Sequence, residues 1–144
     1  AWLDSGSLAT FKDMLNGRGS RKLVNGRYSG CDSGLFKGCT VLNIAAYKGQ
    51  TEMAKLLLRA KANVNLADPS NGKTPLYEAC VKSHTAIIKI LVEAGAEVNQ
   101  GKSNGTTPLA MACLYDHFEA IKMIVHYRMR YSRIPSINIC FRII

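Results

Sequence analysis

Apolar residues return along this chain at the spacing of one helical face. Near the start they occupy positions 8, 11, 14 and 15. The same 3.6-residue period predicts amphipathic helices over residues 52–59, 87–92 and 118–126. Each of these three belongs to a unit with a shorter helix before it, a tight turn between the two helices and an extended polar connection. One such pair cannot bury its apolar face alone, so we expect the pairs to stack and form the core together.

The pattern is also a repeat in the residues themselves. Thr-Pro-Leu occurs at positions 74–76 and again, thirty-three positions later, at 107–109. Other residues recur at the same offset: Asn71-Gly72 as Asn104-Gly105, Ala79-Cys80 as Ala112-Cys113, and His84 as His117. Threonine and proline before an apolar run predict a helix start, because the hydroxyl caps backbone N–H groups and proline at the first helical position loses no hydrogen bond. A fixed period of this length indicates a repeat array.

The period divides the chain into units. We expect, in order, a degenerate N-terminal capping unit (1–15), a loop insertion rich in glycine, serine and arginine (16–37), a repeat unit (38–70), a second unit (71–103), an incomplete third unit (104–131) and a tail outside the repeat (132–144). The insertion is about nine residues longer than the later connections, and it is either a tolerated mobile loop or a functional one. The chain begins at Ala1 without an initiator methionine, which favours a fragment or a processed product.

These motifs resemble those of the ankyrin repeat family. The resemblance rests on the two Thr-Pro-Leu triplets, Ala45-Ala46, the repeated histidine and the segments 62–65 and 95–99, and it covers about residues 38 to 127 well. It implies an all-α solenoid of stacked antiparallel helix pairs with hairpin-like fingers along one edge. Two family positions differ here. The histidine after Thr-Pro-Leu is replaced by Asn43, Tyr77 and Ala110, and the turn glycine found at Gly95 is replaced by Lys61 and Arg128.

The resemblance also implies a partner-binding surface on the fingers and the first helices, on the concave side of the stack. Carried over position by position, this surface includes Phe36, Lys37, Cys39, Tyr47, Lys48, Ser70, Asn71, Lys73, Val81, Lys82, Ser103, Asn104, Thr106, Leu114 and Tyr115. The fold does not require an apolar residue at Tyr47, Val81, Leu114 or Tyr115. Exposed aromatic side chains at such places are typical anchors in protein interfaces, although single exposed apolar residues are also ordinary on surfaces.

Charge and composition narrow the class of partner. The 144 residues carry a formal net charge of +9, which favours an acidic protein surface. Basic residues gather in the insertion and again after residue 127. Nucleic acid is the competing partner, but no reader motif accompanies the charges. No apolar run approaches the roughly 20 residues of a membrane span. Five scattered cysteines indicate reduced thiols and an intracellular protein, cytoplasmic or nuclear. We expect a monomer.

Candidate chemistry is sparse. His84 and His117 fall on framework positions of the resemblance, and His126 stands alone near a helix end, where a cation is favoured. Cys31 and Cys39 have no second pair at zinc-finger spacing, so we expect no metal, and no cofactor motif is complete. The sequence therefore predicts a non-catalytic binding module. The alternatives are a targeting or regulatory region of a larger multidomain protein, such as a kinase or ubiquitin ligase, and a structural spacer.

Overall fold

The computed structural model describes residues 24–27 and 38–131 of the chain. Within these residues six helices form three consecutive pairs: α4 (Val41–Lys48) with α5 (Thr51–Arg59), α6 (Pro75–Val81) with α7 (Thr85–Glu93), and α8 (Pro108–Leu114) with α9 (Phe118–Tyr131). The expected capping unit (1–15), most of the insertion (16–37) and the tail (132–144) lie outside the described residues.

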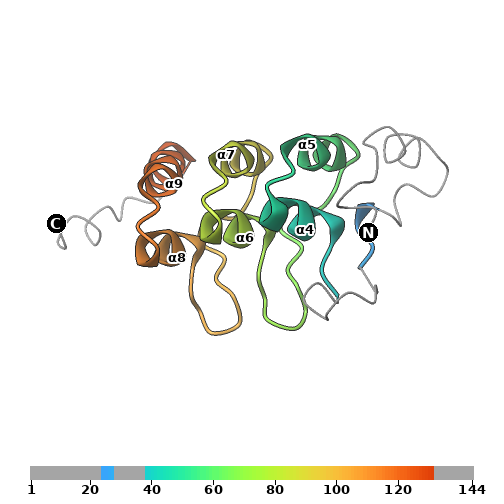
Figure 1. Cartoon of the computed structure of the whole chain (residues 1–144), viewed down its shortest axis with the longest axis horizontal. Helices are drawn as coiled ribbons and strands as arrows, with labels where there is room; N and C mark the ends of the chain where they lie inside the picture. Colours follow the sequence, from blue (N-terminus) through green and yellow to red (C-terminus); the bar gives the residue numbers. More distant parts are fainter. Residues whose placement is uncertain (1–23, 28–37, 132–144) are drawn as a thin grey trace.

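The three pairs stand side by side in two rows (Figure 1). Helices α4, α6 and α8 form one row, in which α4 packs on α6 and α6 packs on α8, and each also packs on the second helix of its own pair. Helices α5, α7 and α9 form the other row. Two long loops, residues 65–74 and 99–107, project from the first row on the side away from the second (Figure 1). The all-α stack of helix pairs with projecting fingers, expected from the sequence, is confirmed.

A threonine side chain caps the N-terminus of each of the three first helices. The hydroxyls accept hydrogen bonds of 3.2 Å from backbone N–H groups three residues on, in the pairs Thr40 with Asn43, Thr74 with Tyr77, and Thr107 with Ala110. Proline follows the cap in α6 and α8, and Val41 takes its place in α4. The helix starts predicted at 74–76 and 107–109 are therefore confirmed. The same capping also works without proline, because the hydroxyl alone satisfies the exposed N–H group.

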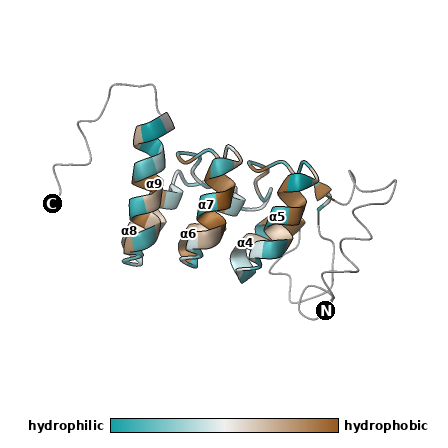
Figure 2. Ribbon diagram, turned by 90° about the horizontal axis from the view of Figure 1, so that it is seen from above, coloured by the Kyte–Doolittle hydropathy of each residue, from teal (hydrophilic) through white to brown (hydrophobic). Residues whose placement is uncertain are grey.

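The core lies between the two rows and repeats with the units. One position of the second helices supplies Leu57, Leu91 and Ile124, which are 0%, 0% and 1% exposed. One position of the first helices supplies alanine at residues 45, 79 and 112, each 0% exposed. Figure 2 shows hydrophobic colouring on α5 and α7, two of the second helices. The central pair has a helix pair on each side, so both of its faces are covered.

Three details differ from the simplest repeat. Lys61 adopts the left-handed backbone (φ 64°) that Gly95 adopts in the next unit, so the turn survives without glycine. Arg128, at the third such position, lies inside α9, because the helix continues through good helix formers to Tyr131. Cys80 is buried, whereas Cys113, at the same position of the third unit, is exposed. No further helix pair covers α8 in the described part of the chain.

The short piece 24–27 follows the repeat although it lies within the predicted insertion. Val24 is 1% exposed, and the Asn25 side-chain oxygen accepts a hydrogen bond of 2.8 Å from the Asn63 N–H group. Asn65 makes the same bond, also 2.8 Å, to the Glu97 N–H group of the following unit. Val-Asn occurs at 24–25, 64–65 and 98–99. Asn25 thus has the role toward the first described pair that Asn65 has toward the second.

Candidate functional site

We use the name finger face for the surface formed by loops 65–74 and 99–107 together with α4, α6 and α8. The residues predicted to bind a partner divide by exposure: exposed are Ser70, Lys82, Ser103, Asn104, Leu114 and Tyr115, and half-buried are Tyr47, Lys48, Asn71, Lys73, Val81 and Thr106. Phe36 and Lys37 lie outside the described residues. The finger face thus keeps twelve of the predicted residues at least partly accessible.

Cys39 was also expected on this surface, and that expectation is wrong. Cys39 is only 6% exposed, because it precedes the capping Thr40 and faces inward beside Asp68. Burial, reinforced by the Asp68 carboxylate, raises the pKa of the Cys39 thiol to about 12. Cys39 is therefore a neutral side chain of the core.

The fingers are held in shape by their own hydrogen bonds. The Asn71 side-chain oxygen accepts from the Lys73 N–H group at 2.9 Å, and Asn104 accepts likewise from Thr106 at 3.1 Å. Asp68 binds the Ser70 hydroxyl at 2.9 Å. These side-chain bonds order the loops locally. The fingers therefore present their side chains from defined positions.

Other hydrogen bonds tie each finger to its neighbours. The Ser103 N–H group donates to the Asn71 carbonyl at 2.9 Å, which joins the two fingers. The Asn43 side-chain amide donates to the Lys73 carbonyl at 2.9 Å. Asn43 replaces the family histidine, and this bond shows that asparagine still links one unit to the next.

A second row of candidate residues follows the C-terminal ends of the first helices. Leu114 is 70% exposed and Tyr115 is 52% exposed. The Lys82 ammonium lies 4.5 Å from the centre of the Tyr47 ring, a cation–π contact that joins α4 and α6. Aromatic, aliphatic and cationic side chains thus occupy equivalent places at the ends of successive helices.

The histidines predicted as framework residues have that role. His84 Nε2 lies 3.2 Å from the Tyr47 carbonyl, and His117 Nε2 lies 3.1 Å from the Val81 carbonyl. Each bond joins the turn of one unit to the first helix of the preceding unit. The carbonyl partners explain why histidine recurs at thirty-three-residue spacing.

A polar cluster between the two fingers was not foreseen from the sequence. The Tyr77 ring is almost fully buried (1% exposed), and the ammonium groups of Lys73 and Lys102 lie 6.0 Å and 5.9 Å from its centre. Glu78 Oε1 lies 3.5 Å from Lys73 Nζ. Its other oxygen, Oε2, is buried and has no hydrogen-bond partner within the described residues. Only Lys73 of these residues was predicted to belong to the site.

Glu78 is the unusual member of this cluster. The same repeat position holds Ile44 in the preceding unit and Met111 in the following one, so aligning the units would have revealed the charge. Burial raises the pKa of the Glu78 carboxyl, and the Lys73 ammonium opposes this only in part. A buried, incompletely paired carboxylate costs stability, and such costs are concentrated at functional sites.

We expect Glu78→Met to stabilise the fold at neutral pH by about 1 kcal/mol, because it removes an incompletely satisfied buried charge. The folded protein holds the Glu78 proton more tightly than the unfolded chain does. Ionisation therefore lowers stability as pH rises from the ordinary glutamate pKa through the raised native pKa. The gain from Glu78→Met should be full above the native pKa and should disappear below about pH 4.

Urea unfolding of both proteins between pH 3 and pH 8 measures this effect. Glu119→Gln, which alters an exposed carboxylate on α9, serves as the control and should leave the pH profile unchanged. A gain from Glu78→Met that is the same at every pH would show that packing, and not charge burial, produces it.

The other candidate groups in the described part of the chain include a buried thiol and acids and histidines that do not gather as metal ligands. Burial raises the pKa of Cys80 to about 12, so its thiol stays protonated. No three His, Cys, Asp or Glu side chains come together as metal ligands within residues 24–27 and 38–131. The helices described for this chain are all too short or too polar to cross a bilayer.

Comparison with known proteins agrees with this architecture. The family model for ankyrin repeats, which contains three copies, matches residues 4–102 and again residues 42–134. The human ankyrin repeat and KH domain-containing protein 1 is 38% identical over 60 residues, which is 42% of this chain and 2% of that protein. The ADP-ribosylation factor GTPase-activating protein AGD2 of Arabidopsis thaliana is 33% identical over 61 residues, 42% of this chain and 8% of that protein.

A third relative covers more of the chain. The tyrosine-protein kinase HTK16 of Hydra vulgaris is 28% identical over 87 residues, which is 60% of this chain and 10% of the kinase. The aligned part thus makes up no more than a tenth of any of these three relatives.

Proposed function

Because the chain belongs to the ankyrin repeat family, we propose that it is a non-catalytic module that binds an acidic protein partner through its finger face. Ankyrin repeats are protein-interaction modules. The observation that carries the proposal is the exposure of Leu114 and Tyr115, at 70% and 52%, at the end of a first helix. Large apolar side chains beside cationic ones are typical anchors for a protein partner.

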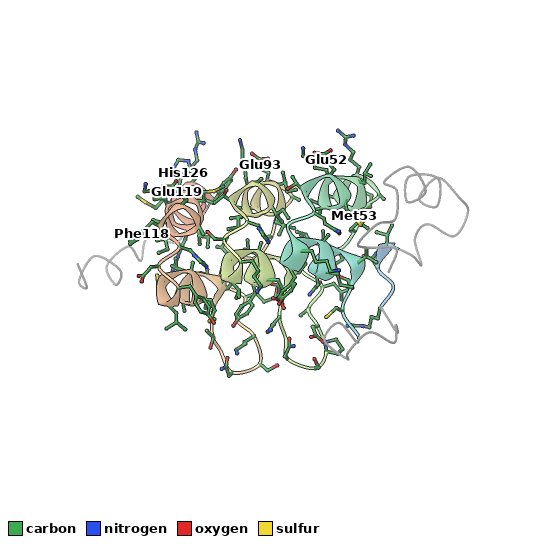
Figure 3. All side chains as sticks on the ribbon, viewed as in Figure 1. Glu52, Met53, Glu93, Phe118, Glu119 and His126 are labelled. Carbon is green, nitrogen blue, oxygen red and sulfur yellow. The ribbon has the colours of Figure 1, made fainter. Side chains whose placement is uncertain are left out.

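The distribution of charge supports an acidic partner. The second helices lie on the side of the stack away from the fingers (Figure 3). On these helices Lys55 forms an ion pair with Glu52 at 2.6 Å, and Lys122 forms one with Glu119 at 2.8 Å. On the finger face, Lys82 and Lys102 form no ion pair within the described residues. These two lysines would steer an acidic surface toward the finger face.

We expect the double substitution Tyr47→Ala plus Tyr115→Ala to weaken partner binding about tenfold or more, since it removes two aromatic anchors. The partner would be captured by crosslinking in an extract of the source cell. It would then be purified, and its Kd for each variant would be measured by calorimetry.

Phe118→Ala provides a matched control. Phe118 is an exposed aromatic residue (67%) at the start of α9, outside the finger face. Its removal should leave the Kd within about twofold, as expected for residues outside the contact. If Phe118→Ala abolished binding and the double variant did not, the end of the stack would be the binding surface and the proposal would be wrong.

A second candidate function is a targeting or regulatory region within a larger multidomain protein, such as a kinase or ubiquitin ligase. The observation in its favour is the small share of each relative that aligns, 2% to 10% for the three proteins above. Sequencing the full transcript decides this: an open reading frame that encodes a catalytic domain supports it, and one without any further domain contradicts it.

The proposal also includes a monomer in a reducing compartment, cytoplasm or nucleus. Its support is that Cys39, Cys80 and Cys113 carry free thiols, as is usual for intracellular proteins. Sedimentation analysis of the purified protein and imaging of a fluorescent fusion test these two points. A dimer, or a secreted fusion, would contradict them.

A further inference from the structure

Lysine side chains from two different fingers lie near the same aromatic ring, that of Tyr77. Lys73 ends the loop 65–74, and Lys102 lies in the loop 99–107. Their ammonium groups are 6.0 Å and 5.9 Å from the centre of the Tyr77 ring. Both side chains thus cover this ring, which is almost completely buried. We name Lys73 and Lys102 the two-lysine clamp.

The clamp has more positive charge than its surroundings neutralise. Lys73 has one acidic neighbour, Glu78 Oε1, at 3.5 Å, and Lys73 itself is about one third exposed (32% of its side chain). Lys102 makes no ion pair with any described residue. Asp68, the other buried acid at the finger base, is already held by Ser70. One positive charge of the clamp is therefore available to a ligand.

We propose that the two-lysine clamp binds the carboxylate of one aspartate or glutamate side chain in an acidic segment of the partner. This inference rests on the proposed protein-binding function and assigns a specific subsite to it. The carboxylate would accept hydrogen bonds from the ammonium groups on the solvent side of the cluster, because the Tyr77 ring itself is buried. Charge-assisted hydrogen bonds of this type are stronger than neutral ones.

The arrangement favours a single carboxylate over a nucleic acid. Glu78 offsets one of the two positive charges of the clamp, and one carboxylate neutralises the other. A duplex needs several lysines spaced along its backbone. Here two ammonium groups lie 6.0 Å and 5.9 Å from the centre of a single ring.

The test uses the whole chain and a deca-glutamate peptide at about 0.15 M salt, where charges beyond about 8 Å are screened. Binding is measured by fluorescence anisotropy and mapped by amide shifts in ¹⁵N NMR spectra. We expect shifts to concentrate at the clamp and around Tyr77. Lys73→Gln and Lys102→Gln should each weaken binding about fivefold, as removal of one charge contact does, and Lys102→Arg should retain it.

Lys89→Gln is the matched control. Lys89 is an exposed lysine on α7, in the same unit as Lys73 but in the row away from the fingers. Lys89→Gln lowers the net charge of the protein by the same amount as Lys73→Gln or Lys102→Gln, and it should alter binding less than about twofold. Thermal unfolding of every variant checks that the fold is intact, and a variant that fails it is replaced by the lysine-to-methionine substitution at the same position, which keeps an unbranched side chain without the charge.

Three outcomes overturn the proposal. Equal losses from Lys89→Gln and Lys102→Gln would show attraction by net charge alone. A twelve-base-pair duplex that binds more tightly than the peptide, with the same dependence on the clamp, would assign the clamp to nucleic acid. Absence of peptide binding would remove the subsite. In each case the captured partner and the tyrosine variants still test the proposed function separately.

Discussion

Leu91→Ala is expected to lower the free energy of unfolding by about 3 kcal/mol, the usual cost of a large cavity in a packed core. Leu91 is 0% exposed in α7, the second helix of the central pair. Since α7 packs on α5, α6 and α9, the cavity would weaken contacts within the unit and with both neighbours. Urea unfolding followed by circular dichroism measures the change.

The control for Leu91→Ala is Val92→Ala, one residue on. Val92 is half-buried, and removing two methyl groups there should cost about 1 kcal/mol. In a repeat array, stability is the sum of the unit stabilities and the couplings between neighbours. We therefore expect Leu91→Ala to lower the slope of the unfolding transition as well. A loss of less than about 1 kcal/mol would show that the stack relaxes around the cavity.

The sequence was sufficient to predict the architecture because its signals are local. A threonine cap depends on residues three positions apart, as in Thr74 and Tyr77. The recurring histidine was predicted as framework, and His84 and His117 each bond the preceding unit. Helix periodicity and a fixed repeat length placed every helix pair that the structure describes.

The candidate site was predicted less completely, because its unusual members depend on tertiary contacts. Lys102 becomes part of the clamp only because its finger lies against the loop 65–74. Glu78 occupies an ordinary helical position in the sequence. Its burial arises from packing between units. Cys39 was expected at the surface but is buried beside Asp68. This contact joins residues far apart in the sequence, so the repeat pattern does not reveal it.

Gly72 and Gly105 offer the sharpest test of how the fingers pack. They occupy the same repeat position and share a left-handed backbone, with φ of 74° and 82°. A Cβ atom at residue 72 would lie 2.7 Å from the Ser103 backbone nitrogen, whereas one at residue 105 would meet nothing within 4 Å. An alanine would therefore meet the same backbone strain at both positions, but the close contact with Ser103 only at residue 72.

Gly105→Ala should therefore cost about 1 kcal/mol, the strain of a left-handed alanine. Gly72→Ala should cost about 1 to 2 kcal/mol more, because Ser103 must move and its bond to the Asn71 carbonyl is lost. Urea unfolding of both variants measures the difference. The shift of Ser103 also carries Lys102 away from Tyr77, so Gly72→Ala, but not Gly105→Ala, should weaken binding of the deca-glutamate peptide. Equal losses of stability would mean that the two fingers move independently, and Lys73 and Lys102 would then not be held beside the same ring.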